Sequence, residues 1–158
     1  MKLSEVFEKA TGKICLVHDT ESKIFYIVMD NKVNAVDQEF LDSYNQILDV
    51  IEAKDEQGMM ITINKSPKVF SAGFNLRHWN KDWPRNMQET IAHMRLLLAR
   101  IMTLNLPTLA IINGHAIAGG AMLALAHDYA FMKSGKHKFF LNEADIGYAV
   151  PYGMIRFI

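Results

Sequence analysis

The sequence predicts an α/β fold in which mostly parallel strands are joined by right-handed helical crossovers. Short β-rich runs alternate along the chain with long amphipathic segments, and this alternation is typical of repeated strand–helix units. Half of the 158 residues are hydrophobic, and the chain contains no long linker, low-complexity tract or exact repeat. Residues 1–158 are therefore expected to form a single domain with a sizeable core.

The first third of the chain predicts a strand pair followed by a helix. Lys13–His18 and Lys23–Met29 are β-rich runs separated by four polar residues, which is typical of a hairpin or close strand pair. In Asp37–Lys54, apolar residues recur at spacings of three and four, which predicts a helix with one buried face. After Gly58, the apolar run Met59–Ile63 has the length of a strand.

The rest of the chain continues the alternation. A second long helix is predicted over Arg85–Thr103, and Pro84 suits its first turn. Pro107–Ile112 is predicted as a strand, and the helix that follows is expected to end near His127. Two further strands are predicted: Tyr129–Met132 and His137–Leu141.

Composition argues against several classes of function. The 17 basic and 17 acidic residues balance, which gives no electrostatic case for nucleic acid or an anionic membrane as partner. Met1–Lys13 lacks an apolar core, so no secretory signal is expected. The single cysteine, Cys15, fits a reducing compartment and is interpreted as a core residue. The apolar stretch Leu109–His127 is interrupted by Asn113-Gly114-His115, so no membrane span is expected.

Three glycines stand out in the apolar stretch. Asn113-Gly114 suits a tight turn after a strand, and Gly119-Gly120 lies where the next helix begins. The first N–H groups of a helix have no intrahelical partner, and glycine lets a ligand approach them. The motif fits a site that polarises a carbonyl with main-chain donors. Close packing of the helix on a strand explains it equally well.

A second segment has the same character. Val69–Leu76 also places small residues and a glycine between a strand and a helical region. Two such turns could converge on one oxygen and form an oxyanion hole of two N–H groups. Spacing alone does not show whether they converge.

Four segments together resemble the crotonase (enoyl-CoA hydratase/isomerase) superfamily. They cover nearly all of the chain in the expected order, and jointly they are highly specific. The segments are Asn34–Val36, similar to "NAL"; Ser71–Leu76, similar to "AGxDL"; Asn113–Gly120 with Leu123, Ala124 and Asp128, similar to "NGxAxGGG…LAxxxD"; and Asn142–Gly147, similar to "PExxLG".

The resemblance implies a spiral of repeated ββα units that binds an acyl-CoA thioester. It implies no separate cofactor, because CoA is part of the substrate. No metal site is expected, because the six histidines show no metal-ligand spacing. The N–H groups of Phe74 and Gly119 would form the oxyanion hole. Residues implied in substrate binding are Ser71, Ala72, Gly73, Asn75, Gly120 and Asn142. Asn75 replaces the family's usual Asp, which leaves its side-chain role open. Lys65 and Lys68 are candidates for phosphate contacts, although a solvated loop charge is the favoured interpretation of both.

The carboxylates suggest which reaction the resemblance implies. Hydratases of the superfamily have two glutamates, and the first of these positions is Met122 here. The second is Glu143, and Δ3,Δ2-enoyl-CoA isomerases typically rely on this residue alone. One base can remove a proton from C2 and deliver it to C4, so an isomerase is expected and a hydratase is disfavoured. Asp145 is a weaker candidate for a supplementary acid. Three further polar residues are interpreted as structural: His115, His127 and Asp128.

The sequence stops where the superfamily continues. Pro151–Ile158 resembles the beginning of a helix, whereas family members continue through several more helices. The chain is therefore expected to be a fragment or a natural short form with an exposed apolar end at Ile155, Phe157 and Ile158. A non-catalytic scaffold subunit is the alternative function. A homotrimer is expected if the protein is complete and a partner protein if it is not, in a peroxisome or mitochondrion.

Overall fold

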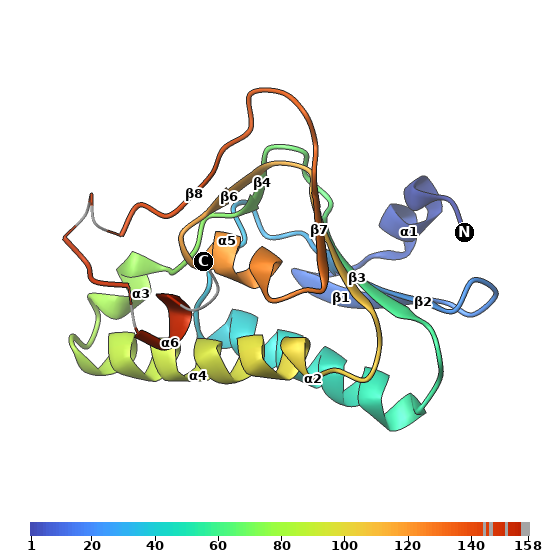
Figure 1. The fold of residues 1–158 in the computed structure, drawn as a ribbon, viewed down its shortest axis with the longest axis horizontal. Coiled ribbons are helices and arrows are strands. Elements are labelled where there is room, and N and C mark those ends of the chain that lie inside the picture. Colours follow the sequence, from blue (N-terminus) through green and yellow to red (C-terminus); the bar gives the residue numbers. More distant parts are fainter. Residues whose placement is uncertain (144, 146, 151, 156–158) are drawn as a thin grey trace.

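Two sheets form the frame of the computed structural model, which describes residues 1–143, 145, 147–150 and 152–155 (Figure 1). The larger sheet contains, in spatial order, β1 (Ile14–Asp19), β2 (Ile24–Met29), β3 (Met59–Asn64), β5 (Thr108–Ile112) and β7 (Tyr129–Met132). The smaller sheet contains β4 (Val69–Ser71), β6 (His115–Ile117) and β8 (Phe139–Phe140). The helices are α1 (Leu3–Lys9), α2 (Gln38–Lys54), α3 (Leu76–Trp79), α4 (Arg85–Met102), α5 (Gly119–Leu125) and α6 (Tyr152–Ile155).

The strand pairing confirms the predicted fold class. β1 and β2 form an antiparallel hairpin, and every other pair of strands among the described residues is parallel. In the larger sheet, Ile61 of β3 lies opposite Tyr26 on one side and Leu109 on the other. In the smaller sheet, β4, β6 and β8 are parallel, so the segments that follow these strands leave from one edge.

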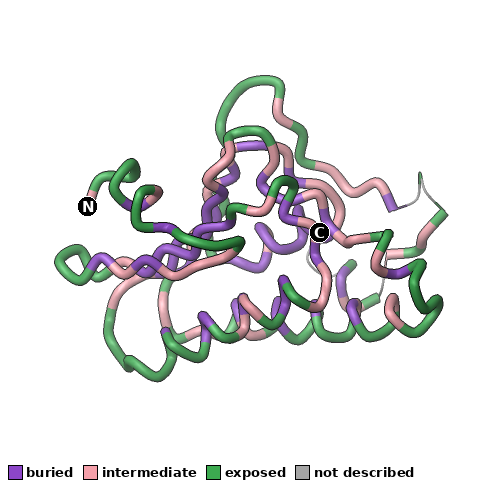
Figure 2. Tube along the Cα trace, turned by 180° about the vertical axis from the view of Figure 1, so that it is seen from behind, coloured by how far each residue is buried: buried purple, intermediate pink, exposed green. Residues whose placement is uncertain are grey.

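The two long helices pack side by side along one side of the larger sheet, and α5 lies between the two sheets (Figure 1). Asp37 caps α2, because its Oδ1 accepts a hydrogen bond from the Phe40 N–H at 3.1 Å. The predicted buried face of α2 is confirmed, and its buried residues are Phe40, Leu41, Tyr44, Ile47, Leu48 and Ile51. Figure 2 shows this inward face alternating with exposed positions along the helix.

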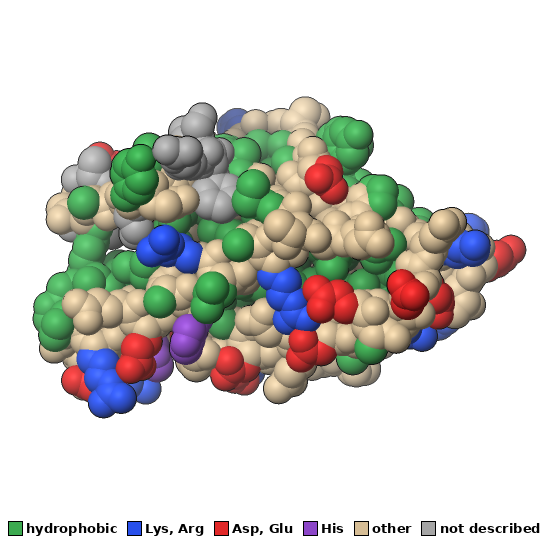
Figure 3. Space-filling model, turned by 60° about the horizontal axis from the view of Figure 1, so that its bottom comes forward, with side chains coloured by type: hydrophobic (Ala, Val, Ile, Leu, Met, Phe, Trp, Pro, Cys, Tyr) green, Lys and Arg blue, Asp and Glu red, His purple; other side chains and the backbone are tan. Residues whose placement is uncertain are grey.

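Ion pairs join the outer surfaces of the same two helices. The Arg100 guanidinium of α4 lies 2.6 Å from Asp49 and 2.7 Å from Glu52 of α2. Acidic and basic side chains are interspersed over this face of the molecule (Figure 3). The face therefore presents no extended surface of one sign.

A chain of buried hydrogen bonds ties α2 to the sheet. His127 Nδ1 lies 2.9 Å from the Leu123 carbonyl oxygen, which can only accept, so Nδ1 carries the proton. His127 Nε2 therefore accepts from the Thr62 hydroxyl at 2.8 Å, and Thr62 in turn accepts from the Tyr44 hydroxyl at 2.6 Å. Burial lowers the pKa of His127 to about 4. The structural interpretation of this histidine is confirmed.

The other two polar residues interpreted as structural also make local contacts. Asp128 accepts hydrogen bonds from the Thr108 N–H at 2.8 Å and the Thr108 hydroxyl at 3.0 Å, which joins the starts of β7 and β5. His115 is half-buried, and its Nδ1 accepts from the Lys138 N–H at 2.9 Å. Cys15 is half-buried and packs against a second, smaller apolar cluster formed by α1 and the outer face of the sheet.

Several boundaries differ from those predicted. α1 was not expected, α5 ends at Leu125, before His127, and β8 is shorter than the predicted strand. A helical turn does occur after Pro151, in α6, where Ile155 is 51% exposed. Pro151, Phe157 and Ile158 lie outside the described residues. None of the described helices combines the length and apolar character needed to cross a bilayer.

Candidate active site

Two turns that follow β4 and β6 lie against each other. The two strands are parallel neighbours, with Val69 opposite His115, so their following turns leave at the same edge. A Cβ added to Gly73 would lie 2.7 Å from the Ile117 carbonyl oxygen and 2.9 Å from the Gly119 nitrogen. Gly73 also has a φ of +78°, so both backbone conformation and close approach require glycine there. The structure thus brings the two turns together. The spacing of their residues in the sequence could not show whether they converge.

The segment before α2 fixes the Phe74 turn. The Val36 N–H donates to the Gly73 carbonyl at 2.8 Å, and the Asn75 N–H donates to the Val36 carbonyl at 2.8 Å. This bridge uses the groups on either side of Phe74 and directs the Phe74 N–H to the opposite side. Gly119 is the first residue of α5, so its N–H has no intrahelical acceptor. Within the described residues, neither N–H donates to another protein group.

The three glycines of the apolar stretch have different roles. A Cβ on Gly120 would lie 2.4 Å from the Ser71 carbonyl oxygen, and one on Gly114 would lie 2.5 Å from the Lys68 carbonyl carbon. These two glycines allow the backbone to pack closely on β4 and its preceding loop. A Cβ on Gly119 would instead meet the edge of the Phe74 ring at 3.4 Å. The packing interpretation therefore applies to Gly114 and Gly120, whereas close contact with the backbone of β4 does not account for Gly119.

Replacing Gly120 by alanine should lower the free energy of unfolding by about 1–3 kcal/mol, the usual cost of overpacking a rigid site. The new methyl group would press on the backbone of β4, which cannot move without disturbing the smaller sheet. Urea unfolding followed by circular dichroism measures the change. Gly119→Ala is the matched control, because its methyl group meets only a side-chain ring edge. Equal losses in the two variants would contradict the packing role of Gly120.

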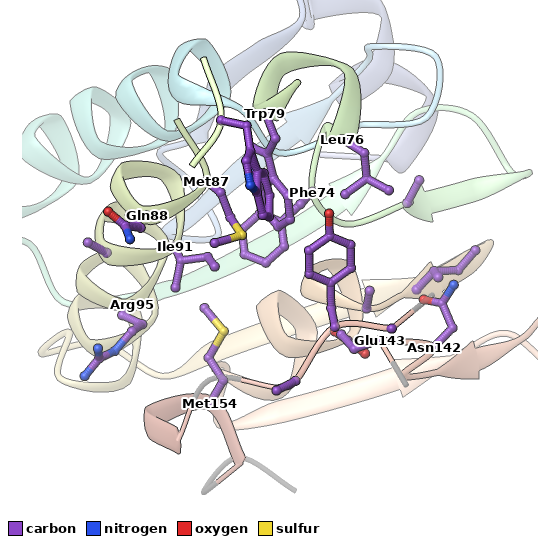
Figure 4. A pocket seen from close by; sticks show the side chains of 18 residues that line it. Phe74, Leu76, Trp79, Met87, Gln88, Ile91, Arg95, Asn142, Glu143 and Met154 are labelled. Atoms are coloured by element: carbon purple, nitrogen blue, oxygen red, sulfur yellow. The ribbon is translucent and has the colours of Figure 1, made fainter. Parts of the chain in front are cut away.

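A cavity of about 660 Å³ opens beside the two turns (Figure 4). One wall consists of residues from the Phe74 turn and α3, and α4 contributes a second wall. The other sides are closed by Ile117, Ala118, Asn142, Glu143, Gly147, Tyr148, Ala149 and Met154. Most of the lining is apolar or aromatic. Such a cavity suits a ligand that consists of a hydrocarbon chain with a few polar groups at one of its ends.

Glu143 lies on the wall of this cavity (Figure 4). The residue is only 8% exposed, and neither carboxylate oxygen has a hydrogen-bond partner among the described residues. Glu143 is also the only carboxylate among the described residues that line the cavity. A buried carboxylate without a partner is costly, and proteins seldom retain one without a functional reason.

The other predicted substrate-binding residues divide into two groups. Ala72 and Asn142 line the cavity, whereas Ser71, Gly73, Asn75 and Gly120 do not. The buried Ser71 hydroxyl donates to the Asn34 carbonyl at 2.7 Å. Asn75 caps α3 and donates from Nδ2 to Asp37 Oδ2 at 2.9 Å. An aspartate could not donate this bond, which gives a physical reason for asparagine at a position where the family usually has Asp.

Met122, Asp145 and the two lysines lie away from the cavity lining. Met122 is fully buried in the main core and does not line the cavity. As a methionine it supplies no carboxylate to the site. Asp145 is exposed. Lys65 pairs with Asp30 at 3.5 Å, and Lys68 is exposed in the loop before β4. Ala144 and Ile146, which complete the Asn142–Gly147 motif, lie outside the described residues.

Sequence reasoning missed most of the aromatic wall. Trp79, Trp83 and Tyr148 line the cavity together with Met87 and Arg95. The ring centroid of Tyr148 lies 5.7 Å from that of Trp79 and 5.9 Å from that of Trp83, and both pairs have edge-to-face geometry. Two tryptophans four residues apart, just after a glycine turn, were the available signal for such a wall.

The comparisons with known proteins agree with these motifs. The family model for enoyl-CoA hydratase/isomerase matches residues 19–158. Enoyl-CoA delta isomerase 3 of Arabidopsis thaliana is 33% identical over 109 residues, which are 66% of this chain and 45% of that protein. The peroxisomal enoyl-CoA delta isomerase 2 of the same plant is 32% identical over 111 residues, 66% of this chain and 46% of that protein. The mitochondrial enoyl-CoA delta isomerase 1 of Rattus norvegicus is 32% identical over 122 residues, 76% of this chain and 42% of that protein.

Solved structures show the same architecture. An enoyl-CoA hydratase/isomerase family protein from Pseudomonas syringae superposes with a TM-score of 0.82 at 24% identity, covering 92% of this chain and 61% of that chain. An enoyl-CoA hydratase from Geobacillus kaustophilus superposes with a TM-score of 0.81 at 27% identity, and the match covers 92% of this chain and 54% of that chain. The crotonase-like fold is thereby confirmed. The chain spans less than half the length of the three curated relatives above.

Proposed function

Because the chain belongs to the enoyl-CoA hydratase/isomerase family, we propose that it binds a 3-enoyl-CoA thioester and moves the double bond to C2. The observation that carries the proposal is Glu143, a buried carboxylate without a partner on the wall of an apolar cavity. The cavity receives the acyl chain. The thioester oxygen lies at the junction of the two glycine turns.

The proposed reaction needs one base and two N–H donors. The Glu143 carboxylate takes a proton from C2, and the electron pair of that C–H bond moves toward the thioester carbonyl. The negative charge then rests on the thioester oxygen, where the N–H groups of Phe74 and Gly119 stabilise it. Glu143 returns the proton to C4, where the electron pair of the broken C3–C4 double bond takes it up. The C1–C2 pair of the enolate becomes the C2–C3 double bond, and the carbonyl is restored. No atom is gained or lost, so no cofactor is consumed.

The single carboxylate supports isomerisation over hydration. Adding water across a double bond requires a positioned water, for which two carboxylates are better suited. Glu143 is the only acidic residue among the described residues of the lining, and Met122 occupies the position of the hydratases' other glutamate. Three relatives above are named delta isomerases, which points the same way. Their names also support a peroxisomal or mitochondrial site of action for this chain.

Incubation of the purified protein with 3-enoyl-CoA tests the proposal. The expected product is 2-enoyl-CoA, detected by chromatography and mass spectrometry against standards. A parallel incubation with 2-enoyl-CoA should yield no 3-hydroxyacyl-CoA. Formation of the hydroxyacyl product would instead establish a hydratase. Absence of both turnover and thioester binding would overturn the proposal and favour the scaffold function.

A further inference from the structure

Glu143 makes no side-chain hydrogen bond among the described residues, so the position of its carboxylate depends on its backbone and on the packing around it. The Tyr148 N–H donates to the Glu143 carbonyl oxygen at 2.8 Å and closes a turn. Gly147, with a φ of +77°, supplies the left-handed conformation just before Tyr148. The turn thus places the Tyr148 ring and the Glu143 carboxylate on one short, closed segment.

The Tyr148 ring connects this segment to the opposite wall of the cavity. It makes edge-to-face contacts with Trp79, at an interplanar angle of 71°, and with Trp83, at 63°. Edge-to-face geometry is directional, because the positive ring edge is attracted to the negative face. These contacts resist rotation of the turn as well as withdrawal from the cavity.

Trp79 also connects the Tyr148 ring to the predicted oxyanion hole. The Trp79 ring centroid lies 5.0 Å from that of Phe74, whose backbone N–H is one of the two proposed donors. Trp79 is only 4% exposed, so this link lies inside the protein. A continuous path of rings therefore joins the proposed donor turn, through Trp79 and Tyr148, to the turn that carries Glu143.

We propose that Tyr148 is a positioning residue, whose ring holds Glu143 at the correct place relative to the N–H groups of Phe74 and Gly119. The inference rests on the proposed isomerase function. It assigns the role to the ring and not to the hydroxyl group, because the contacts with Trp79 and Trp83 are made by the ring. Loss of the ring leaves Glu143 present but free to shift.

Tyr148→Leu should lower kcat for 3-enoyl-CoA isomerisation by about 10- to 100-fold, the scale expected when a reacting group is displaced by about 1 Å. KM should change by less than about threefold, since the apolar wall remains. Tyr148→Phe is the matched control, because it keeps the ring and both contacts. It should retain kcat within about twofold.

A second measurement isolates proton removal. In D2O, the base should exchange the C2 protons of a saturated acyl-CoA for deuterium, which NMR follows without any double-bond shift. Exchange should slow in Tyr148→Leu and not in Tyr148→Phe. If Tyr148→Leu does not fold, Trp83→Leu removes one of the two ring contacts at a half-exposed position. This variant should lower both kcat for isomerisation and the rate of deuterium exchange.

Four results would overturn the inference. Wild-type kcat in the folded leucine variant would show that the ring does not matter, and an equal loss in Tyr148→Phe would transfer the role to the hydroxyl. A rise in KM alone would make Tyr148 a substrate contact only. A wild-type protein that neither isomerises nor exchanges would overturn the proposed function together with this inference, whereas the first three results leave that function intact.

Discussion

Replacing Glu143 by glutamine is expected to lower kcat for 3-enoyl-CoA isomerisation by about 10²–10⁴-fold, the range lost when a general base is removed. Glutamine has nearly the same shape, but its amide does not accept a proton at neutral pH. Because the carboxylate has no hydrogen-bond partner among the described residues, the substitution breaks no visible contact. The variant should therefore bind acyl-CoA normally, and steady-state kinetics with a binding isotherm measures both properties.

Stability gives an independent check on the same variant. Removing an unpaired carboxylate from a buried position should leave the free energy of unfolding unchanged or raise it, because the unfavourable desolvation disappears. Asp145→Asn is the control, since this exposed acid lies two residues away on the same segment and does not line the cavity. It should retain wild-type turnover. Unimpaired turnover in Glu143→Gln would refute the assignment of the base.

Acidification from pH 6.5 to pH 4 should destabilise the folded chain through His127. Burial lowers the pKa of this imidazole from 6.5 to about 4, so only the unfolded state binds its proton readily in this interval. The stabilisation is complete above pH 6.5 and is lost as the pH falls to about 4. At roughly 1.4 kcal/mol per pKa unit, the difference corresponds to about 3 kcal/mol. Protonation would also place a second donor against the Thr62 hydroxyl.

Urea unfolding curves at a series of pH values measure this effect. His127→Gln is the informative variant, because its amide can replace both hydrogen bonds without titrating. It should show a smaller loss of stability between pH 6.5 and pH 4 than the wild type. Parallel pH dependences for the two proteins would exclude His127 as the source.

The long elements were predictable because their signals are local. The buried face of α2 follows from residues within one helix, and the hairpin of β1 and β2 follows from two β-rich runs with a polar connection. α4 begins at Arg85 as predicted and ends within one residue of the predicted boundary. In contrast, α1 has a single fully buried residue, Val6, so its sequence carries little amphipathic signal.

The site was predictable only in part, because its geometry depends on contacts between distant segments. The glycine pattern indicated two turns, but their contact arises from the parallel pairing of β4 with β6. The interaction of Tyr148 with Trp79 and Trp83 joins residues 69 and 65 positions apart, which no spacing rule detects. Likewise, the hydrogen bond from Asn75 to Asp37 explains why residue 75 is asparagine. The sequence does not show that the starts of α2 and α3, which these residues cap, lie close together.

The placement of the tryptophans makes the protein its own optical probe. The chain contains two tryptophans, and both Trp79 and Trp83 line the cavity, so its tryptophan fluorescence reports on that cavity. Trp83 is 50% exposed and should be quenched readily by acrylamide, whereas Trp79, at 4%, should be shielded. An acyl chain that enters between the walls should protect Trp83 and shift the emission to shorter wavelength. Titration with a saturated acyl-CoA would then give an affinity without turnover or an attached label.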